Sequence, residues 1–142
     1  MTDHTFIGVG VLVVRDGCLL LGRRRGSHGA ATWAPPGGHL EADESVGACA
    51  QRELREETAM HAVAWHEGPF ALSEFPERDR RYVTLFVIVT DAHGDAQNCE
   101  PDKCDGWEWH HFDRLPEPLF APLASIVARG WTPEVRGLVG AV

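Results

Sequence analysis

Apolar residues along this chain fall into short blocks separated by glycine and charged residues, which is typical of β-strands joined by turns. The first block covers residues 8–14 (GVGVLVV), and the second covers residues 18–22 (CLLLG). Between them, Arg15-Asp16-Gly17 has the composition of a tight turn. The two blocks therefore predict a β-hairpin that lies in the core.

Further strand signals follow after the central part of the sequence at residues 36–60. Residues 62–65 and 70–75 predict two short strands. Residues 82–90 (YVTLFVIVT) give the strongest signal, because β-branched and aromatic side chains dominate this run. Residues 107–112 (WEWHHF) alternate between apolar and polar, so that both tryptophans share one face of a strand.

Two stretches have helical periodicity. The first is predicted to run from about Val46 to Thr58, and Asp43 or Ser45 can cap its start. The second has Pro118 near its start, and its apolar positions are Leu119, Phe120, Leu123, Ile126 and Val127, with Gly130 past its end. The order of strands, helix, strands and helix indicates an α+β fold with a mixed sheet, an α/β/α sandwich.

Three carboxylates converge on the first predicted helix. Glu53, Glu56 and Glu57 stand at positions i, i+3 and i+4, which share one helix face. The face borders the apolar stripe, which consists of Val46, Cys49, Ala50 and Leu54. Unpaired charge beside a core is costly, so such carboxylates either take up protons or hold a cation. The arrangement predicts a divalent-metal site. The alternative, a surface helix that merely carries charges, fits the apolar stripe less well.

The segment before this helix, residues 33–38 (WAPPGG), has too few backbone donors for regular structure and is predicted to be a loop. The carbonyls of Gly37 and Gly38 are uncovered by side chains, and such carbonyls are good ligands for hard cations. An ordinary tight loop is the alternative interpretation.

Charge limits the classes of partner. The 142 residues suit a single domain, and the formal net charge of −8 argues against binding polymeric nucleic acid or an anionic membrane surface. One phosphorylated ligand remains compatible, because Arg23-Arg24-Arg25 form a local basic cluster just ahead of the carboxylates. Arginine geometry suits phosphate. The alternative for this cluster is a solvated strand end.

The cellular setting follows from apolar runs and cysteines. No apolar run is long enough to span a bilayer, and the N-terminal residues (MTDHTFIG) do not resemble a signal peptide. The four cysteines, at positions 18, 49, 99 and 104, are too scattered for a disulfide framework, so we expect a cytoplasmic protein. A zinc site built from Cys99, Cys104, His110 and His111 matches no compact motif and is not favoured.

The central stretch resembles the signature of the Nudix hydrolases, Gx5Ex7REUxEExGU, in which U is aliphatic. The matching residues are Gly38, Glu44, Arg52, Glu53, Leu54, Glu56, Glu57 and Met60. Ala59 departs from the pattern, because the signature has glycine there. That glycine would suit a left-handed helix end, where alanine costs about 1 kcal/mol.

The similarity extends from Gly8 to about Pro133 and is to the small, MutT-like nucleoside-triphosphate diphosphatase branch. The segments that carry it include GVGVLVV, LLLGRRRGS, PPGGHLE, CAQRE, RYVTLF and EPDKCDGWEW. The resemblance implies a Nudix fold over one hydrolase domain, residues 1–142, and a homodimer.

The resemblance also implies roles for the matching residues. Glu53, Glu56 and Glu57 would bind Mg²⁺ or Mn²⁺, helped by the carbonyl of Gly37 or Gly38. A further carboxylate could come from Glu100, Asp102 or Glu108, and Glu100 is preferred. Arg52 would orient Glu53. Glu44 would sit at the edge of the metal shell or hold the loop to the helix. Glu57 or Glu53 would be the catalytic base.

The resemblance is to a branch that includes animal enzymes acting on oxidised and thiopurine nucleotides, and it implies that the base is bound at Ala34, Pro35, Thr84, Ala121, Pro122 and Leu123. Arg23 and Arg25 of the basic cluster, together with Gly38, complete the predicted substrate-binding set. Several of these differ from the animal relatives, so the base preference is the least transferable inference. Trp33, Trp107 and Trp109 could stack on a base, but a place in the sheet core is favoured.

Three functional hypotheses follow. The leading one is Mg²⁺-dependent hydrolysis of (deoxy)nucleoside triphosphates, including oxidised ones such as 8-oxo-dGTP, to a nucleoside monophosphate and pyrophosphate. The first alternative is hydrolysis of ADP-ribose or another nucleoside diphosphate derivative, to which Pro76 lends slight support. The second is a nucleotide-binding Nudix module without catalysis, which the complete set of glutamates disfavours.

Overall fold

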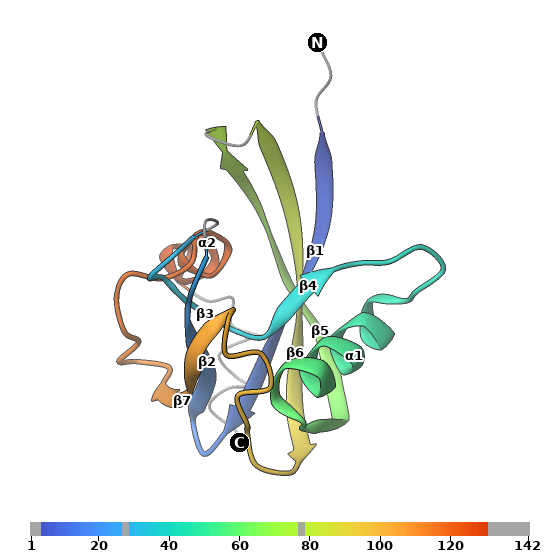
Figure 1. The fold of residues 1–142 in the computed structure, drawn as a ribbon, viewed down its shortest axis with the longest axis vertical. Helices are drawn as coiled ribbons and strands as arrows, with labels where there is room; N and C mark the ends of the chain where they lie inside the picture. The colour runs from blue at the N-terminus through green and yellow to red at the C-terminus, as the bar shows by residue number, and fades with distance from the viewer. Residues whose placement is uncertain (1–3, 27–28, 77–78, 131–142) are drawn as a thin grey trace.

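In the part of the chain that the structure describes, a mixed sheet carries one helix on each face (Figure 1). The computed structural model describes residues 4–26, 29–76 and 79–130, so that Pro133, where the family resemblance ends, lies outside these ranges. The strands are β1 (Thr5–Arg15), β2 (Cys18–Arg24), β3 (Trp33–Ala34), β4 (Gly37–His39), β5 (His61–Phe75), β6 (Arg80–His93) and β7 (Cys104–His111). The helices are α1 (Val46–Thr58) and α2 (Ala121–Ala128). The predicted α+β class with a mixed sheet is confirmed.

Strand β1 is the middle strand of the main path through the sheet. The main path runs β3-β2-β1-β6-β5, while β4 also pairs with β1 and β7 also pairs with β2. The β1–β6 pair is parallel, and every other pair is antiparallel. The middle of β1 pairs with β4, and its last residues pair with β2. Strands β2 and β4 therefore follow different parts of the same strand.

The core consists of two clusters, one on each face of the sheet. Alternate residues of β1 supply both, because neighbouring side chains on a strand point to opposite faces. Val11 and Val13 join Leu54 of α1 in one cluster, whereas Leu12 and Val14 join Leu123 and other residues of α2 in the other. The two tryptophans of β7 pack against the α1 cluster, as their alternation predicted.

The predicted hairpin and first helix are confirmed. Asp16 and Gly17 both have positive φ, as a two-residue hairpin turn of type I′ requires. The helix α1 begins at Val46 after Ser45, whose Oγ accepts a hydrogen bond from the Ala48 N–H at 3.1 Å. It ends at Thr58, and the next residue, Ala59, adopts the left-handed conformation and donates its N–H to the carbonyl of Arg55 at 3.0 Å.

Three predictions of local structure were wrong. Residues 62–65 and 70–75 belong to one long strand, β5, which absorbs the interruption as an irregular register between Glu67 and Phe70. The segment 33–38 is not simply a loop, because it contains the two short strands β3 and β4. The second helix begins at Ala121 and not near Pro118, because the segment before it pairs with Trp33.

None of the helices in the described ranges combines the length and the apolarity needed to cross a bilayer. Strand β5 is a long edge strand and has several exposed apolar side chains, including Phe70 and Leu72.

Candidate active site

The Gly-Gly pair of β4 lets α1 approach the sheet closely. The N–H of Gly37 donates a 2.9 Å hydrogen bond to Oε2 of Glu57. A side chain at Gly38 would overlap the carboxylate of Glu53, and a side chain at Gly37 would overlap the backbone oxygen of Val9. Both glycines are therefore required sterically where α1 presents its carboxylates to the backbone of β4.

Arg52 holds the loop before α1 against the first carboxylate. Its guanidinium donates to both oxygens of Glu44, at 2.7 and 3.1 Å, and to Oε1 of Glu53 at 2.9 Å. It also donates to the carbonyl of His39 at 3.3 Å. The hydrogen bonds with Arg52 lower the pKa of Glu44 to about 2. Such bidentate, charge-assisted contacts fix both the loop and the orientation of Glu53.

The environment of Glu57 disfavours its charged form. Burial raises the pKa of Glu57 to about 9, and the hydrogen-bonded Glu53 adds to the rise. A cation beside the two carboxylates would offset their desolvation and repulsion. Glu56 is different, because its side chain is 48% exposed and its carboxylate contacts Arg52 at 3.4 Å. Among the described residues, no three acidic, histidine or cysteine side chains already converge as a preformed ion site.

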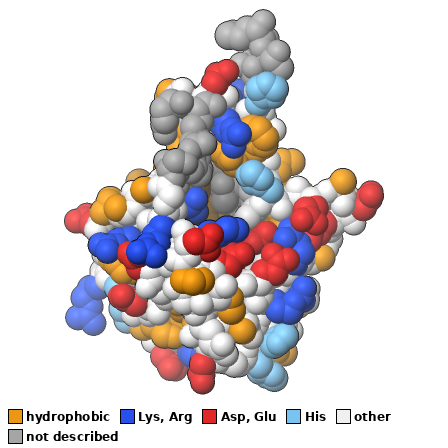
Figure 2. Space-filling view, in the orientation of Figure 1, with side chains coloured by type: hydrophobic (Ala, Val, Ile, Leu, Met, Phe, Trp, Pro, Cys, Tyr) orange, Lys and Arg blue, Asp and Glu red, His pale blue; other side chains and the backbone are white. Residues whose placement is uncertain are grey.

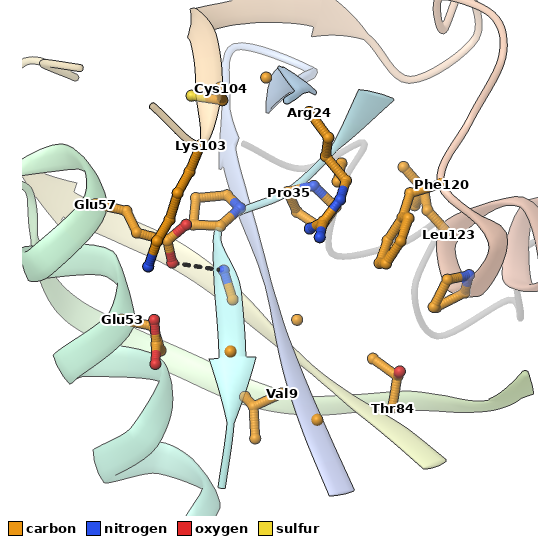
Figure 3. A pocket seen from close by; sticks show the side chains of 18 of the residues that line it. Val9, Arg24, Pro35, Glu53, Glu57, Thr84, Lys103, Cys104, Phe120 and Leu123 are labelled. Atoms are coloured by element: carbon orange, nitrogen blue, oxygen red, sulfur yellow. Dashed lines mark hydrogen bonds between the residues drawn. The ribbon is translucent and has the colours of Figure 1, made fainter. Parts of the chain in front are cut away.

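A cavity of about 500 Å³ connects these carboxylates with an apolar region (Figure 3). Glu53, Glu57 and Lys103 lie at one end of the view, and Arg24 and Phe120 lie at the other. Thr84 of β6 and Leu123 of α2 complete the apolar end, and the glycines of β1 at positions 8 and 10 line the cavity beside them. The volume lies within the range of small-ligand sites, and its two ends suit a ligand with a charged part and a flat apolar part.

Comparison with known proteins identifies the family of this chain. A model described as NUDIX domain matches residues 4–130. The chain belongs to the NUDIX domain family. The protein is therefore a Nudix hydrolase, as the signature in its central stretch predicted.

The sequence identity to individual relatives is low, although the family model matches most of the chain. The chain is 29% identical over 109 residues to the oxidized purine nucleoside triphosphate hydrolase of Danio rerio, over 75% of this chain and 66% of that protein. It is 26% identical over 118 residues to the ADP-ribose pyrophosphatase of Methanocaldococcus jannaschii, over 82% and 68%. The matched region thus spans about two thirds of either relative's length.

Solved structures support the fold independently. The crystal structure of a MutT NUDIX hydrolase from Burkholderia pseudomallei superposes with a TM-score of 0.78 and 24% identity, covering 99% of each chain. At that identity the match shows a common Nudix fold, and the chemistry of the site must be argued from its own residues.

The cavity of this Nudix hydrolase contains most of the residues that the sequence singled out. Those that line it are Glu53, Glu57, Gly37, Gly38, Glu100, Arg25, Pro35, Thr84 and Leu123. Behind them, Leu54 is fully buried in the α1 cluster, and Arg52 and Glu44 form the network described above. The functional roles of these residues stay predictions, although their positions agree with them.

Two predicted residues are not brought to the cavity. Arg23 is exposed and its Nε contacts Oδ2 of Asp105 at 2.8 Å, away from the cavity lining. Glu56 also lies outside the lining. The same Asp105 binds Nε of Arg25 at 2.8 Å, so that it fixes the end of β2 to β7. Asp102 and Glu108, the alternatives to Glu100, do not line the cavity.

Two basic residues of the cavity were not selected as site residues: Arg24, which the sequence placed only in the basic cluster, and Lys103. The guanidinium carbon of Arg24 lies 4.3 Å from the ring centre of Phe120. Burial lowers the pKa of Arg24, while Glu57 acts in the opposite direction. Strand periodicity does not single out Arg24, because the β2–β7 register is irregular between Gly22 and Arg24. Lys103 belongs to the connection between β6 and β7, whose path no local pattern predicts.

Proposed function

We propose that this Nudix hydrolase cleaves (deoxy)nucleoside triphosphates, including oxidised ones such as 8-oxo-dGTP, to a nucleoside monophosphate and pyrophosphate. One observation carries the proposal: a single cavity joins the carboxylates Glu53 and Glu57 to an apolar end lined by Phe120 and Leu123. Cleavage of a diphosphate needs the carboxylates, and binding of a nucleobase needs the apolar end. The likeness to the fish oxidized purine nucleoside triphosphate hydrolase supports the same substrate class.

The donor set fits Mg²⁺, for which Mn²⁺ can substitute. Glu53, Glu57, Glu100 and the carbonyl of Gly37 or Gly38 would supply hard oxygen ligands. Glu56, which stands outside the cavity lining, could join them only after its side chain turns inward. Bound there, the metal would neutralise the diphosphate and acidify a water molecule.

The protein's own groups then have separate tasks. Arg52 orients Glu53 through the 2.9 Å hydrogen bond, which leaves the second carboxylate oxygen for other contacts. Glu57 is the proposed base that accepts the proton of the attacking water, with Glu53 as the alternative. Gly38 is the proposed substrate-binding position next to Glu53, and its missing side chain leaves room for the carboxylate of Glu53.

The remaining groups bind the nucleotide. Pro35, Thr84 and Leu123 form the wall around the base. Arg25 contributes positive charge at the cavity, while its contact with Asp105 holds it in place. Arg23 is no longer proposed as a direct ligand of the substrate, because its side chain is directed to Asp105 outside the cavity.

A panel of substrates tests this proposal. The protein is incubated with Mg²⁺ and (deoxy)nucleoside triphosphates, 8-oxo-dGTP, ADP-ribose or dinucleoside polyphosphates, and the products are identified. Pyrophosphate released from triphosphates supports the proposal. AMP and ribose phosphate from ADP-ribose, without turnover of triphosphates, would favour the alternative that the archaeal ADP-ribose pyrophosphatase suggests. Nucleotide binding without turnover in either wild type or Glu57→Gln would indicate a binding module.

We further propose a cytoplasmic homodimer built from one Nudix domain, residues 1–142, per chain. The four cysteines are free thiols, which suits a reducing compartment. Ile7 of β1 and Phe70 and Leu72 of β5, two strands that β6 separates, expose 45 to 59% of their surface, which is the kind of apolar surface that a second copy could cover. Sedimentation equilibrium tests this, and a monomer at all concentrations would contradict it.

A further inference from the structure

Lys103 stands out because it is the single lysine among the thirteen lysine and arginine residues of the chain. It lines the same cavity as Glu53 and Glu57. Figure 3 shows its side chain extending from the β6–β7 connection toward these two carboxylates. On the face shown in Figure 2, acidic and basic side chains are intermixed in a band across the middle of the molecule. The position of Lys103 therefore adds a positive charge at an otherwise acidic end of the cavity.

The backbone of Lys103 is fixed while its ammonium group is not. Its N–H donates to the carbonyl of Glu100 at 2.9 Å, and its carbonyl accepts from the N–H of Arg25 at 2.8 Å. The side chain is 67% exposed, and its nearest ion-pair contact is a long one, 3.5 Å from Nζ to Oε2 of Glu100. A lysine of this kind carries a compact charge on a flexible stem, so it can exchange one anion for another without backbone movement.

The other basic residues that line the described cavity are engaged differently. The guanidinium of Arg25 binds Asp105 at 2.8 Å and the carbonyl of Pro101 at 2.9 Å. Arg24 packs over the ring of Phe120, toward the apolar end. Lys103 is thus the basic residue placed to meet a mobile anion beside the carboxylates.

We propose that Lys103 binds the terminal phosphate of a nucleoside triphosphate and thereby favours triphosphates over nucleoside diphosphate sugars. A terminal phosphate carries up to two negative charges near neutral pH, whereas a sugar at the same place carries none. The ammonium group supplies three donors and a point charge for it. This inference rests on the proposed function, because it specifies which class of diphosphate substrate the same cavity selects.

Kinetics with two Lys103 variants form the first test. Lys103→Gln is expected to lower kcat/KM for a triphosphate roughly tenfold or more, mainly through KM, and to change kcat/KM for ADP-ribose less than about twofold. Lys103→Arg should restore most of the loss, because it keeps the charge. Arg114→Gln, which removes an exposed positive charge outside the cavity, is the matched control. Equal losses on both substrates, or no loss on either, would overturn the inference.

Binding without turnover forms the second test and needs no metal. Reductive ¹³C-methylation of the wild-type chain gives one dimethyl-lysine resonance, and the α-amino group serves as an internal control. Tripolyphosphate added in the presence of EDTA should shift the lysine resonance and leave the α-amino resonance in place. An unshifted lysine resonance up to millimolar tripolyphosphate contradicts the inference. If the lysine resonance shifts but the wild type hydrolyses no triphosphate, the proposed function fails while the anion contact stands.

Discussion

At the residue scale, Gly37 and Gly38 show how a missing side chain positions a charged one. The sequence predicted this pair because of its exposed carbonyls, and the structure adds a steric reason that is different for each glycine. A Cβ at Gly38 meets the movable end of Glu53, whereas a Cβ at Gly37 meets the backbone of β1. Local sequence could not predict this difference, because it depends on how closely α1 packs on β4.

Alanine at the two positions should therefore fail in different ways. Gly38→Ala is expected to keep the fold but to lower kcat roughly 100-fold, because it displaces Glu53. Gly37→Ala should lower the free energy of unfolding by about 1 to 3 kcal/mol through overpacking. Urea unfolding and steady-state kinetics measure both effects.

Gly8→Ala is the matched control for stability. Its Cβ would make only ordinary contacts, the nearest 3.7 Å from Oγ1 of Thr84. Its free energy of unfolding should stay within about 0.5 kcal/mol of wild type. A Gly37→Ala protein as stable as Gly8→Ala would show that the backbone of β4 can shift, contrary to this interpretation.

The cysteines should differ in reactivity at the same scale. Cys49 is fully buried, and burial raises the pKa of its thiol from 9.0 to about 12. The thiolate is the reactive form, so a higher pKa leaves less of it at pH 8. Cys99 is exposed. Iodoacetamide at pH 8 is expected to modify Cys99 within minutes and Cys49 only after denaturation, as peptide mass spectrometry can measure. Equal rates in the native protein would contradict the burial of Cys49.

At the scale of elements, signals carried by neighbouring residues were sufficient for α1 and insufficient for β5 and α2. The apolar stripe and Ser45 predicted the limits of α1, because caps and periodicity are local. The pair Gly68-Pro69 looks like a turn between strands, yet β6 continues alongside and holds β5 together. The start of α2 depends on the pairing of Leu119 with Trp33, which is distant in sequence.

The ends of α1 provide a test of the one departure from the Nudix signature. Ala59 adopts φ 65°, so Ala59→Gly should raise the free energy of unfolding by about 1 kcal/mol. Ser45→Ala should lower it by about 1 kcal/mol, because it removes the cap on Ala48. Urea unfolding measures both, and hydrolysis by Ala59→Gly should match wild type. A destabilised Ala59→Gly protein would show that the family glycine is not needed for helix termination here.

At the scale of the whole molecule, the sequence predicted the carboxylates well and the rest of the cavity less well. Glu53 and Glu57 lie within one helix, so a helical wheel is enough to bring them together. Arg24, Lys103 and Phe120 come from three separate segments, and only the folded sheet brings them to one cavity. Which of Arg23, Arg24 and Arg25 reach the cavity depends on an irregularity in the β2–β7 register, and the amino-acid composition does not reveal it.

The two core clusters form without any contribution from the proposed metal ligands, so metal removal should separate activity from folding. Protein dialysed against EDTA is expected to keep its circular dichroism spectrum and to lose hydrolysis, and either Mg²⁺ or Mn²⁺ should restore it. Added Mg²⁺ should also raise Tm, because it binds only the native state. Glu57→Gln should reduce that rise. Full activity in EDTA would contradict a metal-dependent mechanism.

The pairing of β1 with both β4 and β6 makes the strand alignment itself a condition for turnover. The β1–β6 ladder runs from Thr5 opposite Arg81 to Val13 opposite Val89. A slip by one residue would reverse the direction of every β1 side chain, so that the β1 residues of one core cluster would face the opposite side of the sheet. A molecule with misaligned strands could remain compact and yet have no hydrolytic activity. Specific activity of a refolded sample therefore measures the fraction of chains with the native alignment, which spectra of secondary structure would not distinguish.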